Sequence, residues 1–349
     1  MARKEKTDPG ALQRLKNDLR AGQLGPLYLF YGPESYLREH YLALARKKLT
    51  DGPAESFNYH RFNAENLTMD ALQNAIEAMP MLAEATMVQV DDVDPYKLPQ
   101  PDRERLTELL SDIPPYCHVF FVFDTVAYQP DRRQKKLHGV LEGQGSAVSF
   151  EKQSERELAA WITKHFAGFG KQISVDLCRY LILRTGGTMT ALRSEIEKVA
   201  AYAPAEEITK AEIDAVVEPV LEAYVFDMTD AIAAGRYDTA LATLQTLFQL
   251  QQEPIVLLAA IGMQLRRIYC AQLLQAAGKG AESLMHLCGM GSYPAKKTMG
   301  YARRLSEGFS KAALQACALT DYRLKTSYDT PQRLLELLLL QLAQEVKHA

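Results

Sequence analysis

Three short, almost uninterrupted apolar runs in the first 150 residues limit the fold more than any other feature of this chain. They cover residues 27–31, 87–90 and 118–124. None alternates between polar and apolar residues as a strand with one wet face does, so each is typical of a strand in a parallel sheet buried on both faces. Helical patterns separate the runs, and a fourth run at 147–150 ends the series. We therefore predict an α/β domain of the nucleotide-binding type over residues 1–150.

The pattern changes after Lys152, because no later segment is typical of a strand. Ser154 and Glu157 have the spacing of a capping box that begins a helix. Two further short helical patterns follow, and longer ones continue to the C-terminus. We predict a three-helix domain over residues 151–218 and an all-helical domain over residues 219–349.

The composition narrows the class of protein. Apolar residues make up 47% of the 349 residues, yet no window approaches the roughly 18 uninterrupted apolar residues of a membrane span. The first residues are charged rather than signal-like, so we expect a cytoplasmic protein without a membrane partner. The five cysteines are scattered without a C-x-x-C pair, so we expect no disulfide framework and no metal site.

Charge is distributed unevenly around the net value of −3. Residues 51–115 carry thirteen acids against four bases, whereas residues 260–311 carry eight bases against two acids. A basic C-terminal region is compatible with contact to nucleic acid, and a solvated helix face would explain it equally well.

The first apolar run ends in a loop that stands where an NTPase binds phosphate. The loop consists of Gly32, Pro33, Glu34 and Ser35. A working loop, G-x-x-x-x-G-K-[ST], wraps phosphates with backbone amides, reaches them with Lys and holds magnesium with Ser or Thr. This loop is shorter, lacks the Lys, and has a Glu that repels phosphate. We predict that it is a tight turn that binds no nucleotide and that the protein needs no cofactor.

No other segment has the pattern of a catalytic site. The seven His residues are dispersed and no Ser stands in a G-x-S-x-G elbow, so we name no catalytic residue. Asp91 and Asp92 after the second run imitate a magnesium-holding strand end. Without a loop Lys beside them, we interpret them as a solvated turn.

Five motifs in this order give the chain a resemblance to a known family. They are LFYGPESYL at 29–37, TGGTMTALRSEIEKV at 185–199, FDMTDAI at 226–232, YPAKK at 293–297 and DYRLK at 321–325. The ordered set resembles the bacterial DNA polymerase III delta family. That resemblance implies an AAA+-like (RecA-like) α/β domain, a helical lid and a helical collar.

The resemblance also implies a function and partners. The delta subunit of the DNA polymerase III clamp loader binds and opens the beta sliding clamp and does not itself hydrolyse ATP. Its collar joins the motor subunits (gamma or tau) and the delta-prime subunit, and the complex acts on primer-template DNA. The resemblance implies a non-catalytic subunit of the DNA polymerase III holoenzyme that is a monomer when isolated.

The segment Met79, Pro80, Met81 and Leu82 lies between a helical pattern at 68–79 and the second strand. Pro disfavours helical geometry in the residue before it, so the apolar residues after it can project from an exposed turn. They can equally pack the corner between helix and strand. The resemblance implies the first alternative, a hydrophobic wedge for a pocket on the clamp, although family members often carry Phe here and this chain does not.

DNA contact is predicted at two places in the last domain. Lys296, Lys297, Arg303 and Arg304 could neutralise phosphates, and Tyr328 could stack on a base at the primer-template junction. Ordinary surface charge and a packed Tyr are the alternatives.

Two other classes of protein stay open at this point. One is an ATP-hydrolysing AAA+ replication protein, such as a clamp-loader motor subunit or an initiator, against which the missing loop Lys argues. The other is a helical adaptor without clamp contact, in which residues 78–83 belong to the core.

Overall fold

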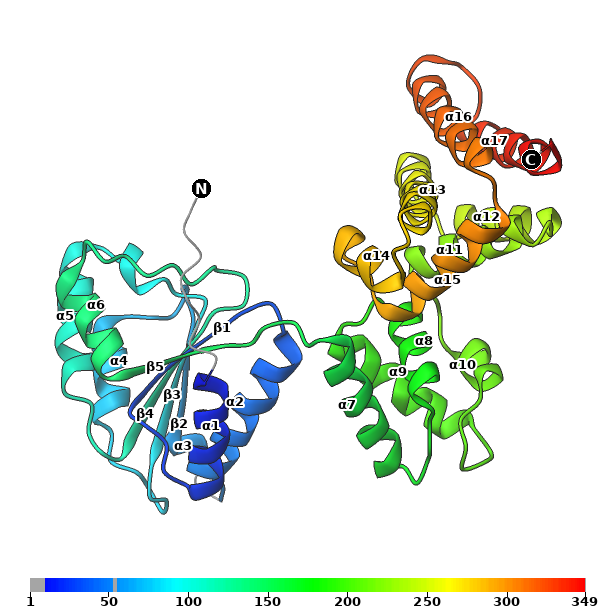
Figure 1. Ribbon diagram of the computed structural model, residues 1–349. Helices are drawn as coiled ribbons and strands as arrows, with labels where there is room; N and C mark the ends of the chain where they lie inside the picture. The colour runs from blue at the N-terminus through cyan, green and yellow to red at the C-terminus, as the bar shows by residue number, and fades with distance from the viewer. Residues whose placement is uncertain (1–9, 53–54, 349) are drawn as a thin grey trace. The chain divides into compact units, whose positions relative to one another are not determined.

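The computed structural model describes residues 10–52 and 55–348. The chain forms two compact units, of which the first ends at Lys152 and the second begins at Gln153 (Figure 1). The first unit has the predicted α/β fold, and every described element of the second is a helix.

The first unit is built on a five-stranded sheet in which every pair of neighbouring strands is parallel. The order of strands is β2-β3-β4-β1-β5. The four predicted strands are confirmed, and β2 is an additional one that the apolar runs did not indicate. Its residues are half-exposed because it lies at the edge of the sheet. The strands are β1 Leu27–Tyr31, β2 Tyr59–Phe62, β3 Thr86–Asp91, β4 Cys117–Val122 and β5 Gly145–Ser149.

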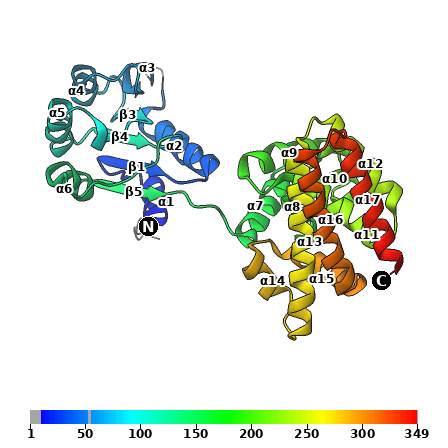
Figure 2. The same cartoon turned by 90° about the horizontal axis from the view of Figure 1, so that it is seen from above.

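Helices cover both faces of this sheet, which is why its strands are apolar on both sides (Figure 2). One face carries α1 Ala11–Ala21 and α2 Ser35–Thr50, and the other carries α4 Met69–Glu77, α5 Gln100–Ser111 and α6 Lys135–Gly143. The short elements are α3 Glu55–Asn58 and the 3-10 turn η1 Pro95–Lys97.

Aromatic side chains fill the core under α1 and α2. Tyr28 stacks on Phe120 with ring centroids 4.9 Å apart, while Phe30 meets Phe120 edge-on at 5.4 Å and Phe150 at 5.0 Å. Each ring contributes a large buried area, and such pairs add about 0.5–1.5 kcal/mol beyond that burial. This packing fixes the ends of β1 and β5, between which the loop after β1 lies.

The second unit begins at the predicted capping box. The Ser154 hydroxyl accepts a hydrogen bond from Glu157 N, and the Glu157 carboxylate accepts one from Ser154 N at 2.8 Å. Four helices follow rather than the three predicted. They are α7 Glu155–Gly168, α8 Val175–Thr185, α9 Met189–Tyr202 and α10 Lys210–Val216. The additional one, α10, is short.

A helical bundle makes up the rest of the second unit. Its helices are α11 Leu221–Ala233, α12 Tyr237–Gln249, α13 Pro254–Ala276, α14 Ala281–Cys288, α15 Ser292–Arg304, α16 Glu307–Thr326 and α17 Pro331–His348. The sequence patterns did not predict the fold of residues 279–310, which form α14 and α15. Each of these two helices follows a glycine that interrupts the apolar periodicity.

Among the described helices, α13 alone is long and apolar enough to cross a membrane by length and composition. Leu257, Ile261, Leu265 and Ile268 on this helix are buried in the core of the bundle. The central helix of a bundle has the same composition as a membrane span, so this property is weak support for a span.

Polar contacts connect the helices α7–α10 to the bundle within the second unit. Arg184 of α8 pairs with Asp227 of α11 at 2.5 Å, and the Glu155 carboxylate of α7 accepts a hydrogen bond from Ser292 N at 2.5 Å. The separate domains at 151–218 and 219–349 stay a prediction.

Candidate functional site

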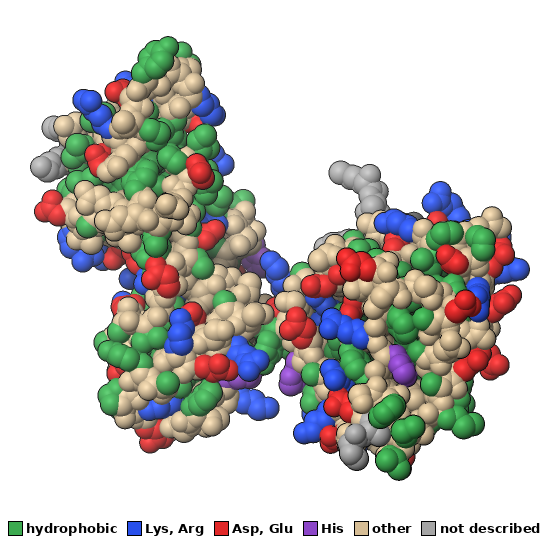
Figure 3. Space-filling view, turned by 180° about the vertical axis from the view of Figure 1, so that it is seen from behind, with side chains coloured by type: hydrophobic (Ala, Val, Ile, Leu, Met, Phe, Trp, Pro, Cys, Tyr) green, Lys and Arg blue, Asp and Glu red, His purple; other side chains and the backbone are tan. Residues whose placement is uncertain are grey.

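Residues Met79, Pro80, Met81 and Leu82, which we call the 79–82 tip, lie in the loop between α4 and β3. The helix ends at Glu77, two residues before the predicted end. Met79, Met81 and Leu82 are 81%, 50% and 84% exposed, so they do not pack the corner between helix and strand. Figure 3 shows hydrophobic side chains on the surface at the lower end of this unit.

A buried amide holds the backbone of the tip. Asn58, which is fully buried in α3, donates from Nδ2 to the Met81 carbonyl at 2.8 Å and accepts from Met81 N at 2.7 Å. The Tyr116 hydroxyl donates to the Glu77 carbonyl at 3.1 Å and so fixes the end of α4. These contacts hold the loop in place while its apolar side chains stay in solvent.

Leu82 has a φ of +53°, which is uncommon for a residue with a branched side chain. Left-handed backbone costs about 1–2 kcal/mol for such a residue, and it persists where surrounding contacts impose it. The strain is therefore located at the most exposed apolar side chain of the tip. A preorganised apolar projection of this kind can dock into an apolar pocket without first being ordered.

The loop after β1 is closed against the end of β5. Gly32 has a φ of +117°, and a Cβ on it would lie 2.5 Å from the Phe150 carbonyl oxygen. Glu34 N donates to that same oxygen at 2.9 Å, and Pro33 has no N–H to offer. Only three residues separate β1 from Ser35, the first residue of α2. The backbone amide of Glu34 is thus already hydrogen-bonded within the protein, whereas a phosphate-binding loop leaves its backbone amides free to bind the phosphates.

Two charged side chains complete this closed loop. Arg38 is buried, donates from Nη1 to the Gly32 carbonyl at 2.7 Å and pairs with Asp124. Glu34 is buried as well, and burial raises its pKa against the lowering effects of the Tyr36 N–H and of nearby Lys152 and Arg38. A carboxylate therefore lies at the start of α2, where a phosphate would bind.

Asp92 is more than the solvated turn that we expected. Its carboxylate accepts hydrogen bonds from Asp124 N at 2.7 Å, Thr125 N at 2.9 Å and Val126 N at 3.1 Å, and from the Thr125 hydroxyl at 2.9 Å. It joins the end of β3 to the loop after β4. Sequence spacing gave no sign of this, because three of the four donors are backbone atoms more than thirty residues away.

Asp92→Asn should lower the free energy of unfolding of the first unit by about 1–3 kcal/mol at neutral pH. Burial alone would raise the pKa of Asp92, but the Val126, Asp124 and Thr125 donors outweigh it and hold the pKa below its usual value. The stabilisation is therefore complete above the unfolded pKa and disappears as pH falls through the lower, folded pKa. Amide exchange of β3 and β4 in the full chain between pH 7 and pH 3 measures it. A pH-independent difference between the two proteins would contradict this assignment.

The predicted DNA-contact residues lie at two separate places. Lys296, Lys297 and Arg304 on α15 line a hollow of about 350 Å³, and Arg303 is exposed beside it. No ion pair joins any of these four to another described residue. Tyr328 is fully exposed in the loop between α16 and α17. Helix α16, which is about 30 Å long, stands between α15 and this loop along the chain, and both ribbon views show the loop at the far end of α16 from α15 (Figures 1 and 2), so the structure does not bring them into one site.

Neither a metal site nor a disulfide is present among residues 10–52 and 55–348. No group of three or more His, Cys, Asp or Glu side chains there could hold a metal ion. All five cysteines are free thiols, and burial raises the pKa of Cys117 to about 11.

Comparison with known proteins places the chain in a family. The family model described as "DNA polymerase III, delta subunit" matches residues 28–151, and the one described as "DNA polymerase III delta subunit, C-terminal domain" matches residues 222–342. The first range contains the tip, and the second contains most of the bundle.

Individual relatives agree with this assignment over 70% or more of the chain. "DNA polymerase III subunit delta" of Bacillus subtilis is 26% identical over 330 residues, which is 93% of this chain and 94% of the relative. "Probable DNA polymerase III subunit delta" of Aquifex aeolicus is 25% identical over 249 residues, which is 70% and 71%. The solved Bacillus subtilis DNA clamp loader delta protein has the same fold, with a TM-score of 0.55 at 24% identity over 95% of this chain and 99% of that one. The chain belongs to the DNA polymerase III delta subunit family.

Proposed function

We propose that this chain works in the cytoplasm as the delta subunit of a clamp loader and docks the 79–82 tip into an apolar pocket of the beta sliding clamp. The observation that carries the proposal is the tip itself, in which Met81 and Leu82 are exposed while buried Asn58 holds the backbone of Met81. Buried apolar anchors concentrate binding energy at interfaces, and Met adapts its shape to a pocket. Clamp capture by chains with and without these two side chains tests the proposal.

Clamp opening then requires no covalent reaction in this subunit. If the tip binds the open or distorted clamp more tightly than the closed one, the closed-to-open equilibrium shifts by the ratio of the two affinities. A preference of about 100-fold shifts that equilibrium by about 100-fold. A tip held rigidly by Asn58 can distinguish two pocket shapes better than a mobile loop could.

The bundle offers surfaces for the other subunits of the loader. Leu250, Ile255, Val256 and Met263 are exposed at and near the turn between α12 and α13. Hydrophobic side chains also reach the surface over the bundle in Figure 3. Apolar side chains that gather on one surface mark interaction sites. We propose that they contact the motor (gamma or tau) and delta-prime subunits.

The closed loop after β1 supports a subunit that neither binds nor hydrolyses ATP. Glu34 occupies the start of α2, and Arg38 is directed at the Gly32 carbonyl rather than at a ligand. Titration calorimetry of the full chain with magnesium-ATP up to about 1 mM should show no saturable binding. Binding with micromolar affinity would instead favour the ATP-hydrolysing AAA+ replication protein.

Contact with primer-template DNA is proposed for the basic residues of α15. Replacing Lys296 and Lys297 with Gln should reduce the slope of log K against log salt by about 2 for DNA binding by the assembled loader. Arg156→Gln plus Lys164→Gln, both exposed on α7, is the matched control. Equal changes in the two variants would show that only the overall charge matters.

A further inference from the structure

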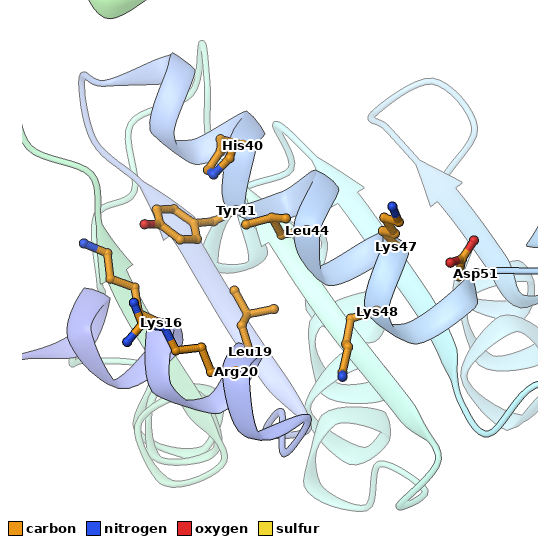
Figure 4. Close-up of a pocket in the computed structure, with 9 residues that line it drawn as sticks. All are labelled: Lys16, Leu19, Arg20, His40, Tyr41, Leu44, Lys47, Lys48 and Asp51. Carbon is orange, nitrogen blue, oxygen red and sulfur yellow. The ribbon is translucent and has the colours of Figure 1, made fainter. Parts of the chain in front are cut away.

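The first unit has a groove between α1 and α2, and no residue of the 79–82 tip lines it. Its volume is about 650 Å³, which is in the range of ligand-binding pockets (Figure 4). We call it the α1–α2 groove. Figure 4 labels the side chains that line it, which come from both helices.

The groove gathers four cations that have no counterion in the described part of the chain. Lys16 and Arg20 stand four residues apart on α1, and Lys47 and Lys48 are neighbours on α2. No ion pair joins any of them to another described residue, and Asp51 is the single acid among the lining residues. Lys16 and Arg20, at positions i and i+4 of α1, lie on one face of the helix and repel one another, so an anionic ligand would relieve this repulsion.

The centre of the groove is apolar. Leu19 from α1 and Leu44 from α2 point toward one another between the two pairs of cations (Figure 4). Leu44 is 41% exposed although it lies inside a concave surface. An apolar side chain placed here would cover both leucines and remove them from water. The groove therefore suits a ligand with negative charges on either side of an apolar group.

The aromatic side chain of the groove offers no platform for a nucleic-acid base. The Tyr41 ring is stacked with Phe150 at 6.1 Å and meets His40 at its edge at 5.3 Å, and the Lys16 amino group lies 5.7 Å over it. Single-stranded nucleic acid is usually bound by bases stacked on free aromatic faces along a continuous basic track. Here an apolar centre interrupts the track, and neighbours occupy the ring.

We propose that the α1–α2 groove binds an acidic peptide segment of another protein, with large apolar side chains over Leu19 and Leu44 and carboxylates beside Lys16, Arg20 and Lys48. The proposal is independent of clamp docking, because it involves neither the tip nor the loop after β1. It gives the α/β unit a second interaction surface.

Fluorescence anisotropy with a labelled ten-residue probe tests this. The probe contains Asp and Glu with one central Leu-Phe pair, and the full chain is titrated at low and at physiological salt. Lys16→Glu plus Lys48→Glu should weaken binding at least about tenfold, because the two substitutions reverse the charge that attracts the acidic probe. Leu44→Ser should weaken it several-fold, because it removes the apolar contact. Lys135→Glu plus Lys136→Glu, exposed on α6 across the sheet, makes the same charge change and should alter binding by less than about twofold.

Variants of the probe test separately whether binding depends on its apolar residues and on its acidic residues. A probe with Ser-Ser in place of Leu-Phe should bind several-fold more weakly, and one with Asn and Gln in place of the acids should not bind. Equal binding of the Ser-Ser probe, equal loss in the α6 control, or tighter binding of an oligothymidine would overturn the proposal. All substituted side chains lie at the surface, so circular dichroism should show unchanged folding.

Discussion

Met81→Ala combined with Leu82→Ala should lower the affinity of the full chain for the beta sliding clamp by at least about 100-fold. Each side chain is an exposed apolar anchor of the kind that contributes about 2 kcal/mol or more at the centre of an interface. The sum is reduced because neighbouring anchors are not additive. Surface plasmon resonance with immobilised clamp measures the loss directly.

Two further variants show whether the loss comes from the tip. Phe169→Ala plus Val175→Ala removes two similarly exposed apolar side chains from the second unit and should leave clamp affinity unchanged. Asn58→Ala keeps both anchors but removes their two backbone hydrogen bonds, and should weaken binding about tenfold by loosening the tip. Full clamp affinity in the Met81 and Leu82 double variant would remove the tip from the mechanism.

Gly32→Ala should destabilise the first unit by about 3 kcal/mol or more. The added Cβ would meet the Phe150 carbonyl oxygen at 2.5 Å, and the φ of +117° is unfavourable for any side chain. To relieve this clash, β1 and β5 must move apart. That movement breaks the 2.7 Å hydrogen bond from Phe150 N to the Tyr31 carbonyl. Amide exchange of β1 and β5 in the full chain should therefore accelerate strongly.

Gly139→Ala is the matched control for this substitution. Gly139 lies in the middle of α6, and a Cβ there meets nothing within 4 Å. Alanine in a helix interior is favoured over glycine by about 0.5–1 kcal/mol, so exchange should slow or stay unchanged. Similar exchange rates in the Gly32 variant and in the control would mean that the loop after β1 tolerates a side chain and is not closed against β5.

The fold was predictable from the sequence where strands are buried, because buried strands consist mainly of apolar residues. Strands β1, β3 and β4 are buried on both faces and therefore appear as continuous apolar runs. Strand β2 has only one neighbour and carries His60 and Arg61, so it has no such signature. The end of α4 was placed two residues too late, because Pro80 marks where a helix must stop and not where it does.

The sequence predicted the apolar residues of the candidate site, but it did not predict the hydrogen bonds that hold their backbone. Met81 and Leu82 follow a helix-breaking proline, which is a local signal. Asn58 lies 23 residues away and bonds to backbone atoms of Met81, which no side-chain pattern reveals. For the loop after β1, the sequence indicated that the phosphate-binding Lys is missing. It did not indicate that the Phe150 carbonyl and the Arg38 side chain form hydrogen bonds with the backbone of this loop.

The most direct test of the tip is methyl NMR of the full chain with labelled methionines, recorded before and after addition of the clamp. The Met79 and Met81 methyl groups, which are exposed in the free protein, should shift or broaden at stoichiometric clamp. The signals of Met189 and Met228, buried in the second unit, should stay unchanged. Clamp binding that leaves the Met79 and Met81 signals in place would contradict docking through the tip.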